Sequence, residues 1–576
     1  MITATGYSNG DDCFIAWSMP WTKDARGFEI RRDLIRADGS HASVVLDNYV
    51  GFAADHPQPH EHRPSTKWPF QRYTWTDHGV AEGDSVTYTI APMLTTAAGA
   101  LARDAASAVT VGPLTATSRA TADIDAYFNR GILLSQFMTR RLPPDFTTKD
   151  LTKLKKALAK DDDELRTFLK GQLGDRLAHL LDTANGKGWH AYAALYELDD
   201  DELIGKLAAF GPRAHVVLSN GSVKAVGADG NAGAVGRLQA ASVDLKRRML
   251  WSEGLGHNKF LVLARTPGDP VAVWTGSTNW ATTGLCTQMN NALLVRNATL
   301  ARIYRDQWQR LHDDERTLPN GKVRHFGPAL MAANDSPTSG GGPVSGRWTT
   351  WFTRTSAKQD LAAATAVING ATEAVLFLMF EPGSAGLRQV VEARLTPGSP
   401  SYLAGLYVHG VVNTLSPGGR KVSVTTTSQG VDKTFGLRVV EPQGVARTDL
   451  ASWAAEVTRQ DFIIGQGGVI GHAIIHSKVI VVDPFSAPVV ITGSHNFSEP
   501  ASTKNDENLL IIRGNRPLAE RYAVNIMGTY QHYRWRAYLQ DCAAKGVSPW
   551  QNLQPSDDWQ KKHAEHDQEL SFWVRP

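Results

Sequence analysis

Two short motifs occur together twice along this chain, and this repetition constrains the fold more than any other feature. HNK at 257–259 is followed by GSTN at 276–279, and HSK at 476–478 is followed by GSHN at 493–496. An apolar run follows each lysine, so we expect both His-x-Lys motifs on β-strands, where side chains two positions apart project from the same face. Each copy therefore offers one imidazole and one ammonium group to a common site.

The segments around the motifs repeat in the same order. Each motif is preceded by a predicted strand, helix and strand, at 189–198, 200–210 and 214–219 in the first half and at 373–382, 384–395 and 406–414 in the second. Similar helices follow the motifs, from Leu300 and from Leu518. A Gly-, Ser- and Pro-rich stretch at 334–346 is predicted to be a hinge between the halves. The pattern indicates an internal duplication in which each half is an α/β sheet flanked by helices.

Residues 1–113 are predicted to form a separate all-β domain. Short apolar or alternating segments are separated there by Gly, Pro and Asp at intervals typical of a β-sandwich. This region resembles a fibronectin type III domain, with Trp17 in the place of its core tryptophan and Tyr88 in the place of its late-strand tyrosine. We therefore predict three domains, at 1–113, 114–340 and 341–576.

The repeated motifs resemble the signature of the phospholipase D superfamily, which is HxK, an aspartate five residues after the lysine, and a downstream GSxN. The second copy carries all of it, with Asp483 in the aspartate position and Glu507 further on. The first copy departs from it, since Ala264 replaces the aspartate and Asn290 stands where the second copy has Glu507. The resemblance implies two pseudo-symmetric phospholipase D-like α/β lobes with one site at their interface, preceded by the all-β sandwich domain.

The resemblance also implies a phosphodiester hydrolase that works without a metal or another cofactor, through a phosphohistidine intermediate. Such a reaction needs a nucleophile, a proton donor and fixed positive charge around the phosphoryl oxygens. The predicted catalytic residues are His257, Lys259, Asn279, His476, Lys478 and Asn496. The predicted supporting residues are Ser277 and Ser494 at the turns, Asp483 as a structural support of its motif, and Glu507 and Asn290 as histidine partners.

The two histidines are expected to have different roles. We expect Glu507 to be the partner of His476, and Asn290, with Gln288 as a nearby alternative, to be the partner of His257. An amide stabilises an imidazolium less than a carboxylate does, which favours His257 as the neutral nucleophile and His476 as the general acid. The tyrosyl-DNA phosphodiesterase branch resembles this layout, and there the first histidine is the nucleophile.

Three functions are compatible with the motifs. Phospholipid headgroup hydrolysis, with some transfer to alcohols, ranks first. The second is a nuclease or another phosphodiesterase, because GSHNFSEPASTKNDEN at 493–508 is similar to the bacterial endonuclease branch, which reads GSxNFT followed by NxEN. A net charge of +3 gives no sign of a dedicated nucleic-acid binder. The third is an inactive binding scaffold, which the retention of both His-x-Lys pairs argues against.

Nothing in the sequence predicts an export signal or a membrane span. The N-terminus lacks a basic start followed by an apolar core, and no apolar run approaches the length of a membrane-spanning helix. Cys13, Cys286 and Cys542 lie far apart, which indicates neither a disulfide framework nor a zinc site. We therefore expect a soluble protein, cytoplasmic or exported with a leader outside this chain. It should act as a monomer on a phospholipid at a membrane surface, with nucleic acid as the alternative substrate.

Overall fold

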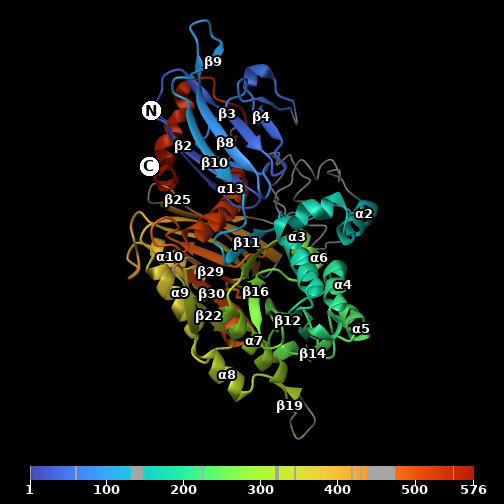
Figure 1. Ribbon diagram of the computed structural model, residues 1–576. Coiled ribbons are helices and arrows are strands. Elements are labelled where there is room, and N and C mark those ends of the chain that lie inside the picture. Colours follow the sequence, from blue (N-terminus) through green and yellow to red (C-terminus); the bar gives the residue numbers. More distant parts are fainter. Residues whose placement is uncertain are drawn as a thin grey trace. The chain divides into compact units, whose positions relative to one another are not determined.

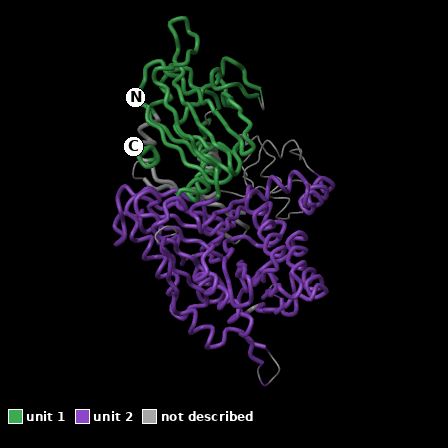
Figure 2. Tube along the Cα trace, in the orientation of Figure 1, with its two compact units in different colours: residues 1–118, 426–433, 520–576 green, residues 119–425, 434–519 purple. Residues whose placement is uncertain are grey.

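The computed structural model of the chain describes residues 2–58, 61–131, 147–223, 225–317, 319, 323–342, 346–383, 385–416, 419–428, 431–437, 474–548 and 551–575. The chain divides into two compact units (Figure 2). Unit 1 contains residues 1–118, 426–433 and 520–576, and unit 2 contains residues 119–425 and 434–519. Both His-x-Lys motifs therefore lie in unit 2.

Unit 1 is rich in β-strands at its N-terminal end, as the sequence predicts. One sheet has the order β1-β2-β7 (Thr3–Ser8, Cys13–Ser18, Thr74–Asp77), and the other has the order β10-β8-β3-β4 (Val109–Thr115, Ser85–Thr95, Ala25–Ile35, His41–Val45), with β9 (Leu101–Arg103) paired to β8. A short pair, β5 (Asp47–Asn48) and β6 (Arg63–Pro64), and the 3₁₀ turn η1 (Ala53–Asp55) complete the region. Trp17, Ile30 and Tyr88 are buried in one core with residues of both sheets. The specific resemblance to fibronectin type III domains remains a prediction.

The end of the chain contributes to this same core. The segments η4 (Asp557–His566) and α14 (Asp567–Trp573) follow helix α13 (Arg516–Lys545), and Trp559 and Leu570 belong to the core cluster that contains Trp17. Residues 520–576 are thus part of unit 1, although the sequence-based boundaries place them in the second lobe. The division into three domains otherwise remains a prediction.

The first half of the duplicated region is built on a 7-stranded mixed sheet. Its order is β11-β18-β16-β15-β12-β13-β14 (Ile124–Phe128, Asn291–Val295, Pro270–Gly276, Lys259–Ala264, His190–Leu195, Ala214–Ser219, Asp244–Arg248). Its helices are α2 (Thr148–Ala159), α3 (Glu164–Gly186), α4 (Asp201–Ala209), α5 (Ala232–Ala240), α6 (Thr282–Cys286) and α7 (Ala298–Asp313). Asp200 and Asn297 fix the starts of α4 and α7, because each side chain accepts a hydrogen bond from a backbone N–H of the first turn.

The second half is built on a 9-stranded sheet. Its order is β21-β22-β30-β29-β28-β23-β24-β25-β26 (Thr338–Gly342, Gly346–Phe352, Asn508–Arg513, Val489–Gly493, Val479–Val482, Ala374–Phe380, Tyr407–Ser416, Gly419–Ser428, Val431–Leu437). Its helices are α8 (Pro328–Asn334), α9 (Gln359–Asn369), α10 (Leu387–Leu395) and α12 (Glu499–Thr503). Within unit 2, α9 and α10 lie on one side and α3 to α6 on the other (Figure 1).

The two sheets repeat one strand order, which supports the predicted internal duplication. In sheet order, the strands from β11 to β13 correspond one to one with the strands from β22 to β24. The strands that carry the motifs match in pairing as well, since β15–β16 and β28–β29 are antiparallel. The strand pairs β12–β13 and β23–β24 are both parallel. Each His-x-Lys motif therefore enters an equivalent central strand.

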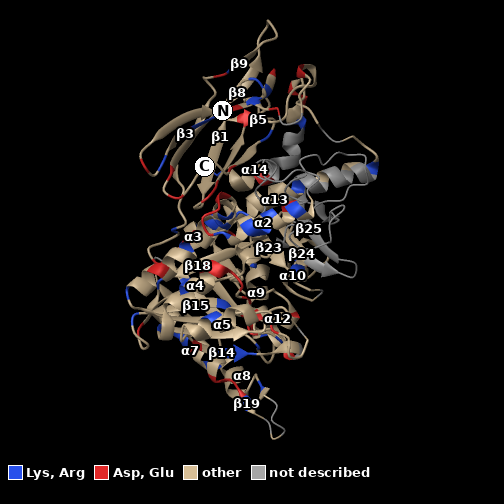
Figure 3. Cartoon of the chain, turned by 90° about the vertical axis from the view of Figure 1, so that its right-hand side faces the viewer, with Lys and Arg blue, Asp and Glu red and all other residues tan. Residues whose placement is uncertain are grey.

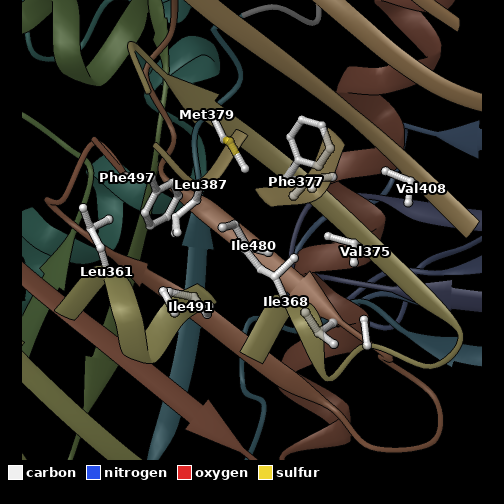
Figure 4. Close-up of a cluster of buried hydrophobic side chains, with 14 of the residues drawn as sticks. Leu361, Ile368, Val375, Phe377, Met379, Leu387, Val408, Ile480, Ile491 and Phe497 are labelled. Atoms are coloured by element: carbon white, nitrogen blue, oxygen red, sulfur yellow. The ribbon is translucent and has the colours of Figure 1, made fainter. Parts of the chain in front are cut away.

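Strand β23 illustrates how the sequence forms the second lobe's core. It reads AVLFLMF and is buried along its whole length, as expected of a strand that is covered on both faces. Val375, Phe377 and Met379 alternate onto one face, where they share a hydrophobic cluster with Leu361 and Ile368 of α9 (Figure 4). The other face of the strand is directed toward the opposite side of the sheet.

The stretch predicted as a hinge between the halves is instead part of the second sheet. Residues 338–342 form β21, which pairs antiparallel with β22. A side chain at Gly340 would meet the ring of Trp348, because a Cβ there would lie 2.4 Å from that ring. The hinge prediction is therefore wrong for these residues, since glycine here permits close packing.

Acidic and basic residues are interspersed along the described elements that face the viewer in Figure 3. Among the described helices, none has the length and apolar character needed to cross a bilayer.

Candidate active site

The two histidines stand at the entrances of equivalent strands. Strand β15 begins at Lys259, so His257 precedes it, and His476 lies between β27 (Ile474–Ile475) and β28. The prediction that each histidine lies on a strand is therefore wrong. Both side chains are nevertheless nearly buried, with exposed fractions of 3% for His257 and 4% for His476.

Each histidine is bound by a residue from the opposite lobe. His257 Nδ1 lies 2.8 Å from Glu507 Oε2, and His476 Nδ1 lies 2.9 Å from Asn290 Oδ1. The sequence-based pairing of Glu507 with His476 and of Asn290 with His257 is wrong. The error arose because each partner was assigned to the histidine of its own repeat, whereas the lobes exchange these residues.

The serines of the GSxN turns hold these partners in place. Ser277 Oγ donates to Asn290 Oδ1 at 2.8 Å, and Ser494 Oγ donates to Glu507 Oε2 at 2.7 Å. In each lobe the serine therefore orients a residue thirteen positions later, which then reaches the histidine of the other lobe. Because Asn290 Oδ1 can only accept hydrogen bonds, His476 must carry its proton on Nδ1 in this pair, which leaves Nε2 for chemistry.

Backbone contacts fix the two lobes in this crossed arrangement. β17 (Gln288–Met289) pairs in parallel with β27, and His476 N donates to Met289 O at 2.9 Å. On the other side, Asp506 N donates to Leu255 O at 2.8 Å. The buried Arg248 adds an ion pair, with 2.6 Å between its Nε and Asp506 Oδ2. The partner residues and the histidines are thus positioned by neighbouring backbone segments.

The two lysines have equivalent surroundings, and each lies beside an aromatic ring that the sequence analysis did not assign to the site. Lys259 Nζ donates to the carbonyl of His257 and lies 4.9 Å from the centre of the Tyr196 ring. Lys478 Nζ donates to the carbonyl of His476 and lies 4.6 Å from the Phe380 ring. These rings also contact the histidines, each with 4.7 Å between ring centroids. A repeated signal marks these rings, because the dipeptides Tyr196-Glu197 and Phe380-Glu381 stand at or just after the ends of the equivalent strands β12 and β23.

The turn asparagines differ in their surroundings. Asn279 Nδ2 donates to Glu197 Oε2 at 2.6 Å. Asn496 is 9% exposed, and its Oδ1 has no hydrogen-bond partner among the described residues. All six predicted catalytic residues nevertheless lie in unit 2. The predicted supporting residues Ser277, Ser494, Glu507 and Asn290 are in direct contact with the site, as described above.

Burial dominates the electrostatics of the site. It lowers the pKa of His257 well below its ordinary value, with Lys259 and Lys478 as further causes, and these effects outweigh the neighbouring carboxylate. Burial also raises the pKa of Glu507 to about 7 and lowers the pKa of Lys259 to about 7. The imidazole of His257 is therefore neutral near neutral pH.

Asp483 lies away from the two histidines, at the far end of β28. Its carboxylate accepts 2.8 Å hydrogen bonds from the backbone N–H groups of Thr372, Glu373 and Ala374 and from the Thr372 hydroxyl. It thus fixes the start of β23, which packs beside β28. Ala264 ends the equivalent strand β15 of the first lobe.

We expect Asp483→Asn to affect stability and not chemistry. An amide offers one acceptor oxygen where the carboxylate offers two, so buried N–H groups lose partners, at a cost of about 2 kcal/mol in the free energy of unfolding. Urea denaturation would measure this cost, and kcat per folded molecule should change by less than about threefold. A large fall in kcat without loss of stability would place Asp483 in the reaction.

One family model matches part of this chain. Residues 426–527 match the family model described as "Cardiolipin synthase, PLD-like domain". No similar protein was found among curated sequences.

Several solved structures are similar to part of this chain at low identity. Phosphatidylserine synthase from Haemophilus influenzae Rd KW20 is 10% identical, with 69% of this chain and 94% of that chain covered and a TM-score of 0.38. The phospholipase D family member Nuc from Salmonella typhimurium is 16% identical, with 27% and 90% covered and a TM-score of 0.21. Polyphosphate kinase from Porphyromonas gingivalis is 13% identical, with a TM-score of 0.35, and the match covers 59% of this chain but only 42% of the kinase. At these TM-scores neither substrate nor activity follows from the likeness.

Residues 426–527 are therefore similar to a PLD-like domain. The first lobe has the same strand order and a second His-x-Lys motif at an equivalent strand.

Proposed function

We propose that this protein cleaves phosphodiesters through a phosphohistidine intermediate, with both motifs contributing to one site. The observation that supports this most directly is the exchange of histidine partners, in which Glu507 binds His257 and Asn290 binds His476. Neither lobe holds a complete set by itself. A single chain therefore suffices for activity, and it acts as a monomer.

The reaction uses the Nε2 atoms of the two histidines, because both Nδ1 atoms are engaged by their partners. Nε2 of one histidine attacks phosphorus while the bond to the leaving oxygen breaks, and the other histidine donates a proton to that oxygen. Water, or an alcohol, then gives a proton to the second histidine and displaces the first from phosphorus. Lys259, Lys478 and the two turn asparagines stabilise the charge on the phosphoryl oxygens.

We assign His257 as the nucleophile and His476 as the general acid. The reason inferred from sequence no longer applies, because the carboxylate lies beside His257. A different reason supports the same assignment: Glu507 stabilises the positive charge that the His257 ring carries once it is phosphorylated. His257 also has a pKa well below its ordinary value, so it is neutral before attack. His476 then takes the remaining role of general acid.

We propose a phospholipid as the substrate class, with hydrolysis of the headgroup ester or its transfer to an alcohol. The description of the matching family model, which names cardiolipin synthase, supports this choice. The protein would meet the lipid at a membrane surface. The chemistry of the site needs no metal, because lysines and asparagines supply the positive charge that a metal supplies elsewhere.

One assay distinguishes this substrate from the alternatives. The protein is incubated in EDTA with phosphatidylcholine and phosphatidylglycerol vesicles, plasmid DNA and single-stranded DNA in parallel. Headgroup release or exchange supports the lipid assignment, and cleavage of DNA alone would replace it with a nuclease. Loss of turnover in EDTA on a soluble diester, restored by added metal, would refute the metal-independent mechanism.

The low pKa of Lys259 predicts an alkaline limit to activity. Burial lowers this pKa to about 7, so the charged form is present below that pH and is lost above it. We expect kcat/KM, which reports the free enzyme, to fall as pH rises through about 7. The decline in kcat should occur at higher pH, because a bound anion stabilises the ammonium group.

Lys259→Arg tests this cause. A guanidinium remains charged throughout this range, so the alkaline decline should move upward by at least about one pH unit, whatever the loss in maximal rate. If the pH profiles of the wild type and the variant superimpose, Lys259 does not set the limit.

A further inference from the structure

A carboxylate lies among the groups that are proposed to bind the phosphoryl oxygens. Glu197 follows strand β12, and its Oε2 accepts a 2.6 Å hydrogen bond from Asn279 Nδ2. Asn279 is one of the two turn asparagines proposed to donate to substrate. Its only amide oxygen is buried without a hydrogen-bond partner among the described residues, so the interaction with Glu197 is its principal polar contact.

The same carboxylate is attracted by both lysines of the site. Lys259, from the first lobe, and Lys478, from the second, both favour the ionised form of Glu197. The charges of two lysines from separate lobes and the amide of Asn279 thus all favour a negative charge on the Glu197 carboxylate. An anionic oxygen of a bound phosphodiester would need these same three groups.

We propose that Glu197 takes the place of a phosphoryl oxygen in the free protein, and that binding of a phosphoryl anion is accompanied by uptake of one proton by Glu197. This inference rests on the proposed function, because it assumes that the lysines and Asn279 form the oxyanion site. Without proton uptake, two anions would compete for the same donors at close range.

Other charged groups near Glu197 act in both directions. Asp199, on the same segment, disfavours its ionised form, and Glu381 and Glu507 act on the adjacent Tyr196 hydroxyl. Burial raises the pKa of Glu197 above its ordinary value, and a hydrogen bond from Ser222 opposes this shift. Further titratable groups at the site are His257, His476, Lys259 and Lys478. Glu197 is partly exposed.

Binding of sulfate to the full chain tests the proposal. Sulfate is a tetrahedral oxyanion whose charge is constant near neutral pH, and it cannot be hydrolysed. Calorimetry in buffers of different ionisation enthalpy measures the protons taken up on binding. We expect the wild type to take up about one proton more than Glu197→Gln, because the glutamine cannot be protonated. Uptake of one proton on binding also makes the affinity fall about tenfold for each unit of rising pH. The glutamine keeps an oxygen that can accept from Asn279.

The variant should also bind sulfate more tightly below about pH 7, where Lys259 keeps its charge. We expect at least about tenfold tighter binding by Glu197→Gln there, because the competing negative charge is absent. Glu197→Ala serves as a second variant if the glutamine impairs folding, and it should change proton uptake in the same way. Asp269→Asn is the matched control, because Asp269 lies at the exposed turn of the β15–β16 hairpin, away from Lys259.

The outcomes separate this inference from the proposed function. Equal proton uptake and equal affinity in the wild type and Glu197→Gln, with diester cleavage intact, would overturn the role of Glu197 alone. If the wild type neither binds sulfate nor cleaves a diester, the oxyanion site itself is wrong, and the proposal on Glu197 fails with it.

Discussion

His476→Asn should give a protein that becomes phosphorylated and then stops. With a 4-nitrophenyl phosphodiester the leaving group needs no proton, so His257 can still attack and release one equivalent of nitrophenol. Resolution of the intermediate then lacks its general base, and turnover should fall by about 10²- to 10⁴-fold. Intact-protein mass spectrometry and peptide mapping under alkaline conditions would locate the adduct on His257.

His257→Asn is the matched variant for this experiment. It should show neither the burst nor the adduct, because the nucleophile is absent. An adduct on His476 in this variant would reverse the two roles while leaving the shared site intact. Equal turnover of both variants and the wild type would refute a phosphohistidine at either position.

Glu507→Gln should reduce kcat by about 10²- to 10³-fold with a smaller change in KM. The carboxylate stabilises the charge on phosphorylated His257, and an amide does this only weakly. Glutamine can still accept a hydrogen bond from Ser494, so the turn should remain in place. Glu499→Gln is the matched control, since Glu499 is exposed on α12, where it pairs with Lys358.

Imidazole ¹⁵N shifts distinguish the crossed pairing from pairing within each repeat. Glu507→Gln should change the Nδ1 resonance of His257 and leave that of His476 nearly unchanged. The opposite response would mean that Glu507 serves the histidine of its own lobe. An unchanged kcat would show that Glu507 contributes to packing alone.

The strands and helices of the duplicated region could be predicted because their signals are local. The run AVLFLMF identifies β23 by its apolar residues alone. Asp200 and Asn297 mark helix starts through the short polar side chains that cap them. The strand order then follows from the duplication, since a repeated sequence of elements folds twice in the same way.

The histidine partners could not be predicted from local patterns. Asn290 and Glu507 stand at equivalent positions after their GSxN turns. This spacing suggests that each binds the histidine of its own repeat. The actual pairs join residues far apart in sequence, because the lobes place 288–290 beside 474–476 and 505–507 beside 255–257. No spacing within one repeat carries that information.

Glu197 and the rings of Tyr196 and Phe380 could be predicted from the sequence only in part. The sequence contains the repeated dipeptides Tyr196-Glu197 and Phe380-Glu381, and an alignment of the two halves would have found them. The roles of the two rings depend on their contacts with Lys259 and Lys478, which are far from them in sequence. The membership of residues 520–576 in unit 1 was missed for a similar reason, because Trp559 and Leu570 pack against strands from the other end of the chain.

A crystal structure with tungstate tests the central claim, that both motifs form one phosphoryl site. The account predicts one tungstate per chain, contacted by Lys259 and Asn279 from the first lobe and by Lys478 and Asn496 from the second. The Nε2 atom of His257 should face the tungsten, and Glu197 should have released Asn279. Two tungstates in separate sites, each bound by one motif, would contradict the shared site.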